Sequence, residues 1–184
     1  MRALECTDQT ADIAPNHHSM TKKIKRIDTH LLDMLSNQAR AVTRGRSHYN
    51  FHESADEPVQ RFLNVMEPGT YVQPHRHAAP PKWELTLALR GHAVILFFDD
   101  SATVIERYDL RADGPIQAVE IPANTWHSVL ALQTGTALLE LKEGPFVGSR
   151  AEKDFAAWAP AEGAADVPEW VTKMTVAQVG DCLV

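Results

Sequence analysis

The stretch that decides the fold reads Gly69-Thr70-Tyr71-Val72-Gln73-Pro74-His75-Arg76-His77, after which the chain continues to Glu84 and Gly91. A second segment further along reads Pro122-Ala123-Asn124-Thr125-Trp126-His127. The spacing of His75 and His77 places both side chains on one face of a β-strand, which it would not do in a helix. Three imidazoles and one carboxylate form a ligand set for a first-row transition metal. The sequence therefore predicts a metal site formed by His75, His77, Glu84 and His127.

The surrounding sequence consists of short β-like runs separated by turn residues such as Pro68-Gly69 and Asp113-Gly114. Short strands with regular turns are typical of an all-β sandwich or barrel and argue against βαβ units. The expected strands are residues 59–66, 71–74, 84–90, 92–98, 103–110, 117–121, 126–132 and 137–142.

Outside this region, residues 27–43 predict a helix, because apolar residues from Leu31 to Val42 recur at helical spacing and Asp28 or Thr29 can cap its start. Residues 44–58 are polar and indicate irregular structure. Three parts are expected: a disordered extension or mis-assigned start at 1–23, the helix and barrel at 24–143, and an irregular tail packed on the barrel at 144–184.

Composition narrows the class of protein. A chain of 184 residues suits one domain, and its net charge of −6 argues against nucleic-acid binding. No apolar run is long enough to span a membrane. The two cysteines, Cys6 and Cys182, do not form a disulfide framework, which favours a cytoplasmic location. The apolar helix and exposed sheet edges favour a homodimer.

The two segments resemble the two cupin motifs, G-x5-H-x-H-x3–4-E-x6-G and G-x5-P-x-G-x2-H-x3-N. Within the cupins, the chain is similar to the WbuC-type cupin-fold metalloproteins, a family associated with bacterial surface-polysaccharide gene clusters. That similarity includes Asn50-x-His52, Pro58-Val59-Gln60-Arg61, Lys82-Trp83-Glu84 and Lys153-Asp154-Phe155-Ala156-Ala157-Trp158-Ala159-Pro160. The resemblance implies a double-stranded β-helix, or jelly-roll barrel, that holds one divalent transition metal: iron, manganese, zinc or nickel.

The chain departs from the motifs at three points. Six residues, including Pro80-Pro81, separate His77 from Glu84, although the distance from Glu84 to Gly91 is kept. Asn124 replaces the glycine of the second motif, which is tolerable because asparagine also adopts left-handed conformations. Ala131 stands where the second motif ends in asparagine.

A second polar cluster precedes the barrel and consists of Arg44, Arg46, His48, Asn50, His52, Gln60 and Arg61. Arginines suit carboxylates or phosphates, and His52 could act as acid or base, although a solvated loop would look the same. Gln60 and Arg61 point to opposite faces of a strand, so at most one enters the cavity. The predicted substrate-binding residues are Asn50, Gln60, Arg61 and Trp83, with core packing as the favoured alternative for Trp83.

Three functions remain open. The first is a metalloenzyme that acts on a sugar or sugar acid, with Glu84 or His52 as the catalytic group that moves a proton. The second is a mononuclear iron dioxygenase with the same ligands. The third is a non-catalytic module that binds a small polar ligand through the metal.

Overall fold

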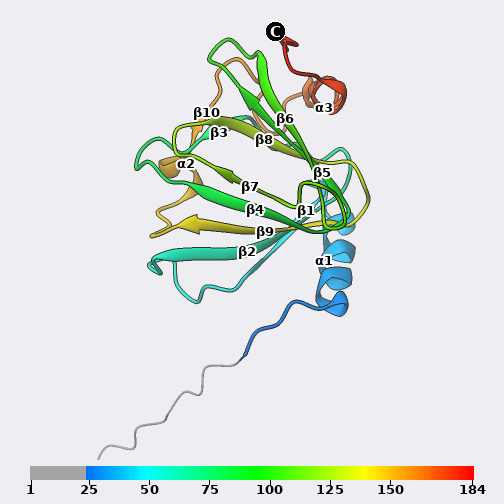
Figure 1. Cartoon of the computed structure of the whole chain (residues 1–184), viewed down its shortest axis with the longest axis vertical. Helices are drawn as coiled ribbons and strands as arrows, with labels where there is room; N and C mark the ends of the chain where they lie inside the picture. The colour runs from blue at the N-terminus through cyan, green and yellow to red at the C-terminus, as the bar shows by residue number, and fades with distance from the viewer. Residues whose placement is uncertain (1–23) are drawn as a thin grey trace, which may run out of the picture.

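The computed structural model describes residues 24–184, so the extension predicted at 1–23 lies outside the described residues. Within that range the chain forms two five-stranded antiparallel sheets with short helices around them (Figure 1). The first sheet has the order β1 (Arg46–Asn50), β2 (Val59–Met66), β9 (Thr136–Glu143), β4 (Glu84–Arg90) and β7 (Ala118–Ile121). The second has the order β10 (Asp154–Phe155), β3 (His75–Arg76), β8 (Trp126–Ala131), β5 (His92–Phe98) and β6 (Val104–Arg111).

One apolar core lies between the two sheets. Met66 and Leu138 from the first sheet are buried in one cluster with Ile95, Phe97 and Leu110 from the second. Strand β5 reads as a continuous apolar run because its other face is also covered. This core fills one part of the space between the sheets, and the polar residues described below line the rest.

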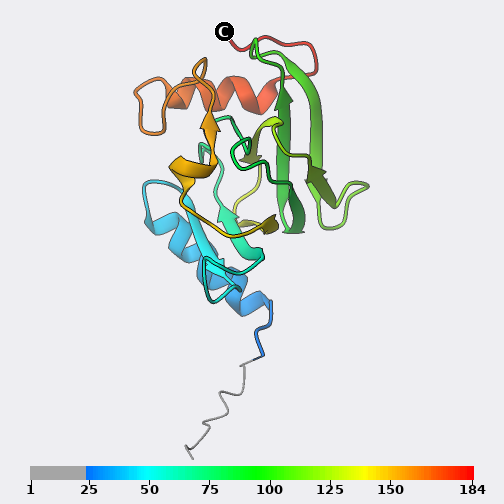
Figure 2. The ribbon, with the colours of Figure 1, turned by 90° about the vertical axis from the view of Figure 1, so that its left-hand side faces the viewer.

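Helix α3 (Val167–Val176) covers the outer face of the second sheet, where Trp170 and Met174 pack with Val94, Leu96 and Phe98 of β5. Helix α1 (Thr29–Ala41) packs against the first sheet through its buried leucines. The two helices lie apart from each other in both views (Figure 1, Figure 2). The short helix α2 (Ser149–Glu152) leads into β10.

The predicted helix is confirmed, with slightly shorter bounds than 27–43. Asp28 caps α1 by accepting a hydrogen bond from the backbone N–H of Leu31 at 2.9 Å. The apolar side of α1 faces the first sheet, since Leu32 and Leu35 are buried against Leu63 and Val65 of β2. Burial of this stripe attaches the N-terminal part of the chain to the barrel.

The sequence suggested that residues 44–58 are irregular, but part of this segment is a strand. Residues 46–50 form β1, which pairs with β2 so that Arg46 lies opposite Met66 and Asn50 opposite Phe62. The alternation of this strand was hidden because Arg46, His48 and Asn50, on one face, are as polar as a loop.

The strand predicted at 71–74 is also wrong, because β3 begins at His75. The carbonyl of Tyr71 accepts a hydrogen bond from Arg46 and the carbonyl of Val72 accepts one from Ser128, both at 2.6 Å. Side chains thus take the acceptors that a strand partner would have used, and Pro74 has no N–H to donate.

The tail is not wholly irregular either. Residues 167–176 form α3, with Pro168 in its first turn, and residues 154–155 form β10. No helix in the described part of the chain is long and apolar enough to cross a membrane.

Candidate metal centre

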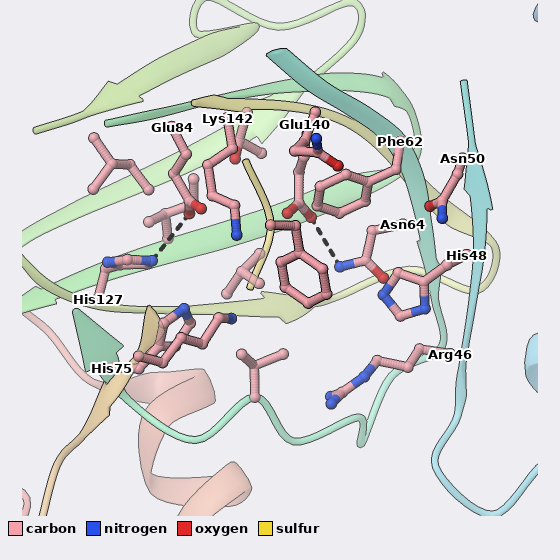
Figure 3. A pocket seen from close by; sticks show the side chains of 18 of the residues that line it. Arg46, His48, Asn50, Phe62, Asn64, His75, Glu84, His127, Glu140 and Lys142 are labelled. Carbon is pink, nitrogen blue, oxygen red and sulfur yellow. Dashed lines mark hydrogen bonds and ion pairs between the residues drawn. The ribbon is translucent and has the colours of Figure 1, made fainter. Parts of the chain in front are cut away.

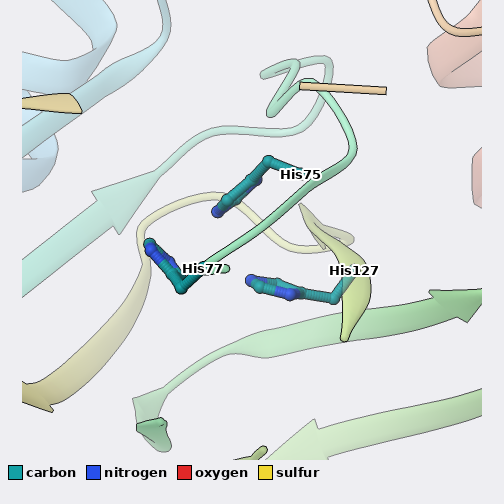
Figure 4. Close-up of side chains that lie close together, drawn as sticks. All are labelled: His75, His77 and His127. Atoms are coloured by element: carbon teal, nitrogen blue, oxygen red, sulfur yellow. The ribbon is translucent and has the colours of Figure 1, made fainter. Parts of the chain in front are cut away.

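Three strands of the two sheets bring the predicted ligands together. His75 on β3 is paired directly with His127 on β8. His77 follows two residues after His75, and the nitrogen ligand atoms of the three rings all lie within 4.8 Å of one another (Figure 4). All three side chains are buried. Three convergent imidazoles shielded from water could hold a metal ion.

Two of these rings are held in one orientation by the backbone. Nδ1 of His75 lies 2.9 Å from the carbonyl oxygen of Gln73, and Nδ1 of His127 lies 2.8 Å from that of Thr125. A carbonyl only accepts, so Nδ1 carries a proton in both rings, and Nε2 is the nitrogen left to face a metal. This is the arrangement by which proteins orient metal-binding histidines.

Glu84 completes the cluster from the first residue of β4. Its Oε1 lies 3.0 Å from Nε2 of His127, and its Oε2 lies 3.2 Å from Nε2 of His77. These contacts lack hydrogen-bond geometry, and within residues 24–184 both nitrogens are buried without a hydrogen-bond partner. Buried nitrogens are rarely left unpaired in folded proteins, whereas a coordinated cation would satisfy them. The four residues therefore fit a divalent metal.

The long loop between His77 and Glu84 does not separate them. Ala78 and Pro81 form an isolated β-bridge, which folds the extra residues into a small turn and returns the chain to Glu84. Asn124 has φ of 62°, as its place in the second motif requires, and its N–H donates to the carbonyl of His77 at 2.9 Å. This hydrogen bond holds the turn before β8 against the first motif.

Protonation states favour metal binding. Burial, and then the positive charge of Lys153, holds the pKa of His75 well below its ordinary value. Burial also lowers the pKa of His77, although Glu84 opposes the shift. Burial by itself raises the pKa of Glu84, but His127 and His77 outweigh it, so that this pKa lies well below the usual range. At neutral pH the site therefore has neutral His75 and His77 and an ionised carboxylate, the forms that bind metals.

The cluster opens into a cavity of about 360 Å³ between the sheets. His75, Glu84 and His127 lie at one side of it, and Arg46, His48 and Asn50 of β1 lie at the other (Figure 3). Apolar side chains such as Ile95 and Val129 form part of the wall. The volume lies in the range of pockets that bind small molecules.

The predicted substrate residues divide between this cavity and other places. Asn50, His52 and Gln60 line it. Within the described range, neither Arg61 nor Trp83 is among the lining residues, and Arg61 lines a separate surface depression. Gln60 and Arg61 therefore do face different sides, with Gln60 inward. The inward amide already donates to the carbonyls of Ala55 and Glu57, at 3.0 and 2.9 Å.

His52 has one ring nitrogen engaged by the backbone of Arg61, since Nδ1 lies 3.0 Å from its carbonyl oxygen and 3.1 Å from its amide nitrogen. Sequence reasoning missed three charged residues of the cavity: Glu140, Lys142 and Lys153. Burial, and then the charge of Glu84, raises the pKa of Glu140 to about 7. Alternation along 137–142 could have indicated that Glu140 and Lys142 share a face, and Lys153 lies in the tail segment of the WbuC-type resemblance.

Comparisons with known proteins agree with the fold. A family model described as a domain of unknown function (DUF6016) matches residues 27–110. No curated protein matches the chain. Among solved structures, CapF bound to the inhibitor 3-isopropenyl-tropolone is similar with a TM-score of 0.51 and 23% identity, over 62% of this chain and 32% of CapF. The aligned part thus spans about a third of the CapF chain.

Two further structures are similar at lower scores. A cupin superfamily protein from Desulfitobacterium hafniense has a TM-score of 0.42 and 22% identity, over 53% of this chain and 76% of that one. The DMSP lyase DddQ from Ruegeria pomeroyi has a TM-score of 0.47 and 18% identity, over 64% and 54%. The two antiparallel sheets with an N-terminal helix are the cupin fold that the sequence predicted, and the two likenesses of low TM-score add no argument to it.

Proposed function

We propose that this cupin binds one divalent transition metal through His75, His77, Glu84 and His127 and acts on a small polar molecule, a sugar or sugar acid. One observation carries the proposal: three buried imidazoles converge beside an ionised carboxylate, and Nε2 of His77 and Nε2 of His127 make no hydrogen bond within the described residues. A purely structural cluster would pair these nitrogens with donors or acceptors of the protein.

When bound, such an ion supplies Lewis-acid polarisation of a substrate oxygen. The protein's own groups then orient the ligand and move protons. Glu140 is a further candidate for proton transfer beside Glu84 and His52, because it lines the same cavity as both. Nδ2 of Asn64 donates to Oε1 of Glu140 at 2.9 Å and so fixes the orientation of the carboxyl group.

The cavity wall supports a hydrophilic substrate, since charged and amide side chains from β1, β2 and β9 surround the apolar patch. The resemblance to WbuC-type proteins supports a role in bacterial surface-polysaccharide metabolism, for which we propose a cytoplasmic location. These two arguments together favour a sugar-like molecule over a lipid.

Elemental analysis of protein purified without chelator or affinity metal tests the metal site. Wild type is expected to hold about one equivalent of metal, and His75→Ala and His127→Ala are expected to hold none. His30→Ala is the matched control, because His30 lies exposed on α1 and should leave the metal content unchanged. Full metal retention in His75→Ala, with normal folding by circular dichroism, would overturn the proposal.

A further inference from the structure

The cavity is positively charged although the whole protein carries a net charge of −6. Four cations line it: Arg44, Arg46, Lys142 and Lys153. Charged wall residues of this kind concentrate ligands of opposite sign. The question is which of these charges are already neutralised by the protein.

Three of these four cations share a carboxylate with a second cation. Arg44 and Arg46 both contact the single carboxylate of Glu162. Lys142 lies 3.1 Å from Glu152, but Glu152 also contacts Lys82 at 2.7 Å. Each group of two cations and one carboxylate keeps one excess positive charge.

Lys153 differs from the other cations that line the cavity, because none of the ion pairs and side-chain hydrogen bonds of residues 24–184 includes it. Its position follows from β10, in which Phe155 is paired with His75 and Asp154 contacts Arg76 at 3.2 Å. Alternation along this segment directs Lys153 to the side opposite Asp154, and it lines the same cavity as His75.

Two carboxyl groups oppose this positive charge. Glu84 is a proposed metal ligand, so a bound divalent cation more than neutralises it. Glu140 cancels at most one of these positive charges, even when its carboxyl group is fully ionised. The cavity of the metal-loaded protein therefore carries a clear excess of positive charge, with Lys153 as its one unpaired cation among the described lining residues.

We infer that the ligand of this cavity is an anion whose carboxylate or phosphate group binds Lys153, with the Arg44–Arg46 group adding positive potential to the same cavity. The inference rests on the proposed function in that the rest of the ligand faces the metal. It excludes the neutral sugars of the proposed function, keeps the sugar acids and adds sugar phosphates. Lysine binds either group as a point charge, so experiment must separate the two.

The test measures anion binding by isothermal titration calorimetry on protein as purified and after chelator treatment. The probes are D-glucuronate, D-glucose 6-phosphate, inorganic phosphate and, as a neutral match, D-glucose, all at constant ionic strength. The variants are Lys153→Met and Lys153→Arg. Lys173→Met is the control, because Lys173 lies on α3 in an exposed pair with Glu169.

Wild type is expected to bind at least one anion more tightly than D-glucose. Lys153→Met should weaken that binding roughly tenfold to a hundredfold, the effect of losing one charged hydrogen bond. Lys153→Arg should restore most of the affinity, and Lys173→Met should match wild type. The tighter anion identifies carboxylate or phosphate as the preferred group.

Equal affinity of Lys153→Met and wild type for every anion would overturn the inference, as would the absence of anion binding in wild type. Metal content of the same samples is measured in parallel. Anion binding that depends on Lys153 in a protein that takes up no metal would overturn the proposed function while leaving this inference intact. One equivalent of metal without anion binding would do the reverse.

Discussion

At the scale of single residues, the site depends on where each imidazole proton lies. The carbonyls of Gln73 and Thr125 hold Nδ1 of the two residues that follow them by two positions, His75 and His127. The same short local contact is therefore used on two strands of one sheet. Such contacts fix the orientation of both rings.

Replacing Glu84 by Gln tests whether the carboxylate binds the metal. The change keeps the shape of the side chain but removes its negative charge. Loss of even an outer carboxylate lowers metal affinity by roughly 10–100-fold, so the loss of a direct ligand should lower it at least as much. Competition with a chromophoric chelator measures the affinity. Unchanged affinity would assign Glu84 to the wall of the cavity and leave a three-histidine site.

The sequence predicted the three histidines well because their roles depend on local spacing along a strand. Glu84 was harder, since the long loop after His77 hides the distance that the turn at 78–81 restores. Lys153 and Glu140 could not be placed, because their position depends on which strand pairs with which. The pairing of β10 with β3 leaves no periodic signal in a two-residue strand.

At the scale of secondary-structure elements, the segment from α2 to β10 is held to the barrel by buried charge. Glu152 is fully buried and forms ion pairs with Lys82 and Lys142. Its Oε1 also accepts a hydrogen bond from the backbone N–H of Val147 at 2.8 Å. The loop before β4, strand β9 and the tail thus meet at one carboxylate. This contact positions the residue that follows it, Lys153.

Glu152→Gln should destabilise the protein, because it leaves two buried lysines without a counter-charge. Breaking a buried ion pair by removing one partner costs about 3–5 kcal/mol. The control is Glu169→Gln on α3, an exposed partner of Lys173, where we expect about 1 kcal/mol or less. Urea denaturation measures both. Equal effects of the two changes would show that the buried cluster adds no stability.

The attachment of α1 is tested by Leu35→Ala. Leu35 is 1% exposed against the first sheet, so its truncation should lower the free energy of unfolding by about 2–5 kcal/mol. Met34, its neighbour on the helix, is 40% exposed, and Met34→Ala should have little effect. Similar losses from both changes, measured by thermal denaturation, would argue that the helix packs differently.

Elements were predictable where the apolar pattern matched the fold. The stripe of α1 and the run of β5 predicted a helix and a buried strand, and both are present. Strand β1 was not predicted because its inward side chains line a polar cavity and are therefore polar, so the strand has no alternating apolar pattern. Helix α3 escaped notice because alanine, proline and acidic residues around it resemble a tail.

At the scale of the whole molecule, metal binding should stabilise the fold. A ligand that binds only the folded state adds about 4 kcal/mol when its free concentration is a thousandfold above Kd. We expect the melting temperature to fall on chelator treatment and to recover on reconstitution. The melting temperature of His75→Ala should not change with chelator. An unchanged melting temperature of wild type in chelator would contradict metal binding.

The contact of Glu162 with Arg44 and Arg46 should make stability depend on pH. Arg44, and then Arg46, lowers the pKa of Glu162 from its usual 4.5. A lowered carboxyl pKa stabilises the folded state above about pH 4.5, and this contribution is lost as pH falls through the folded-state pKa. Glu162 is half-exposed, so the effect is about 1 kcal/mol or less. Glu162→Gln should be less stable than wild type at pH 7 and equally stable at pH 3, as measured by urea denaturation.

The placement of α3 on the second sheet also has a consequence for biosynthesis. Chains emerge from the ribosome N-terminus first, so all strands from β1 to β9 are translated before residues 144–184. Until α3 follows, the nascent barrel displays Val94, Leu96 and Phe98 of β5 to the solvent. A polypeptide stalled or cleaved near Gly144 therefore exposes an aggregation-prone surface, which makes it a natural client for chaperones and proteases.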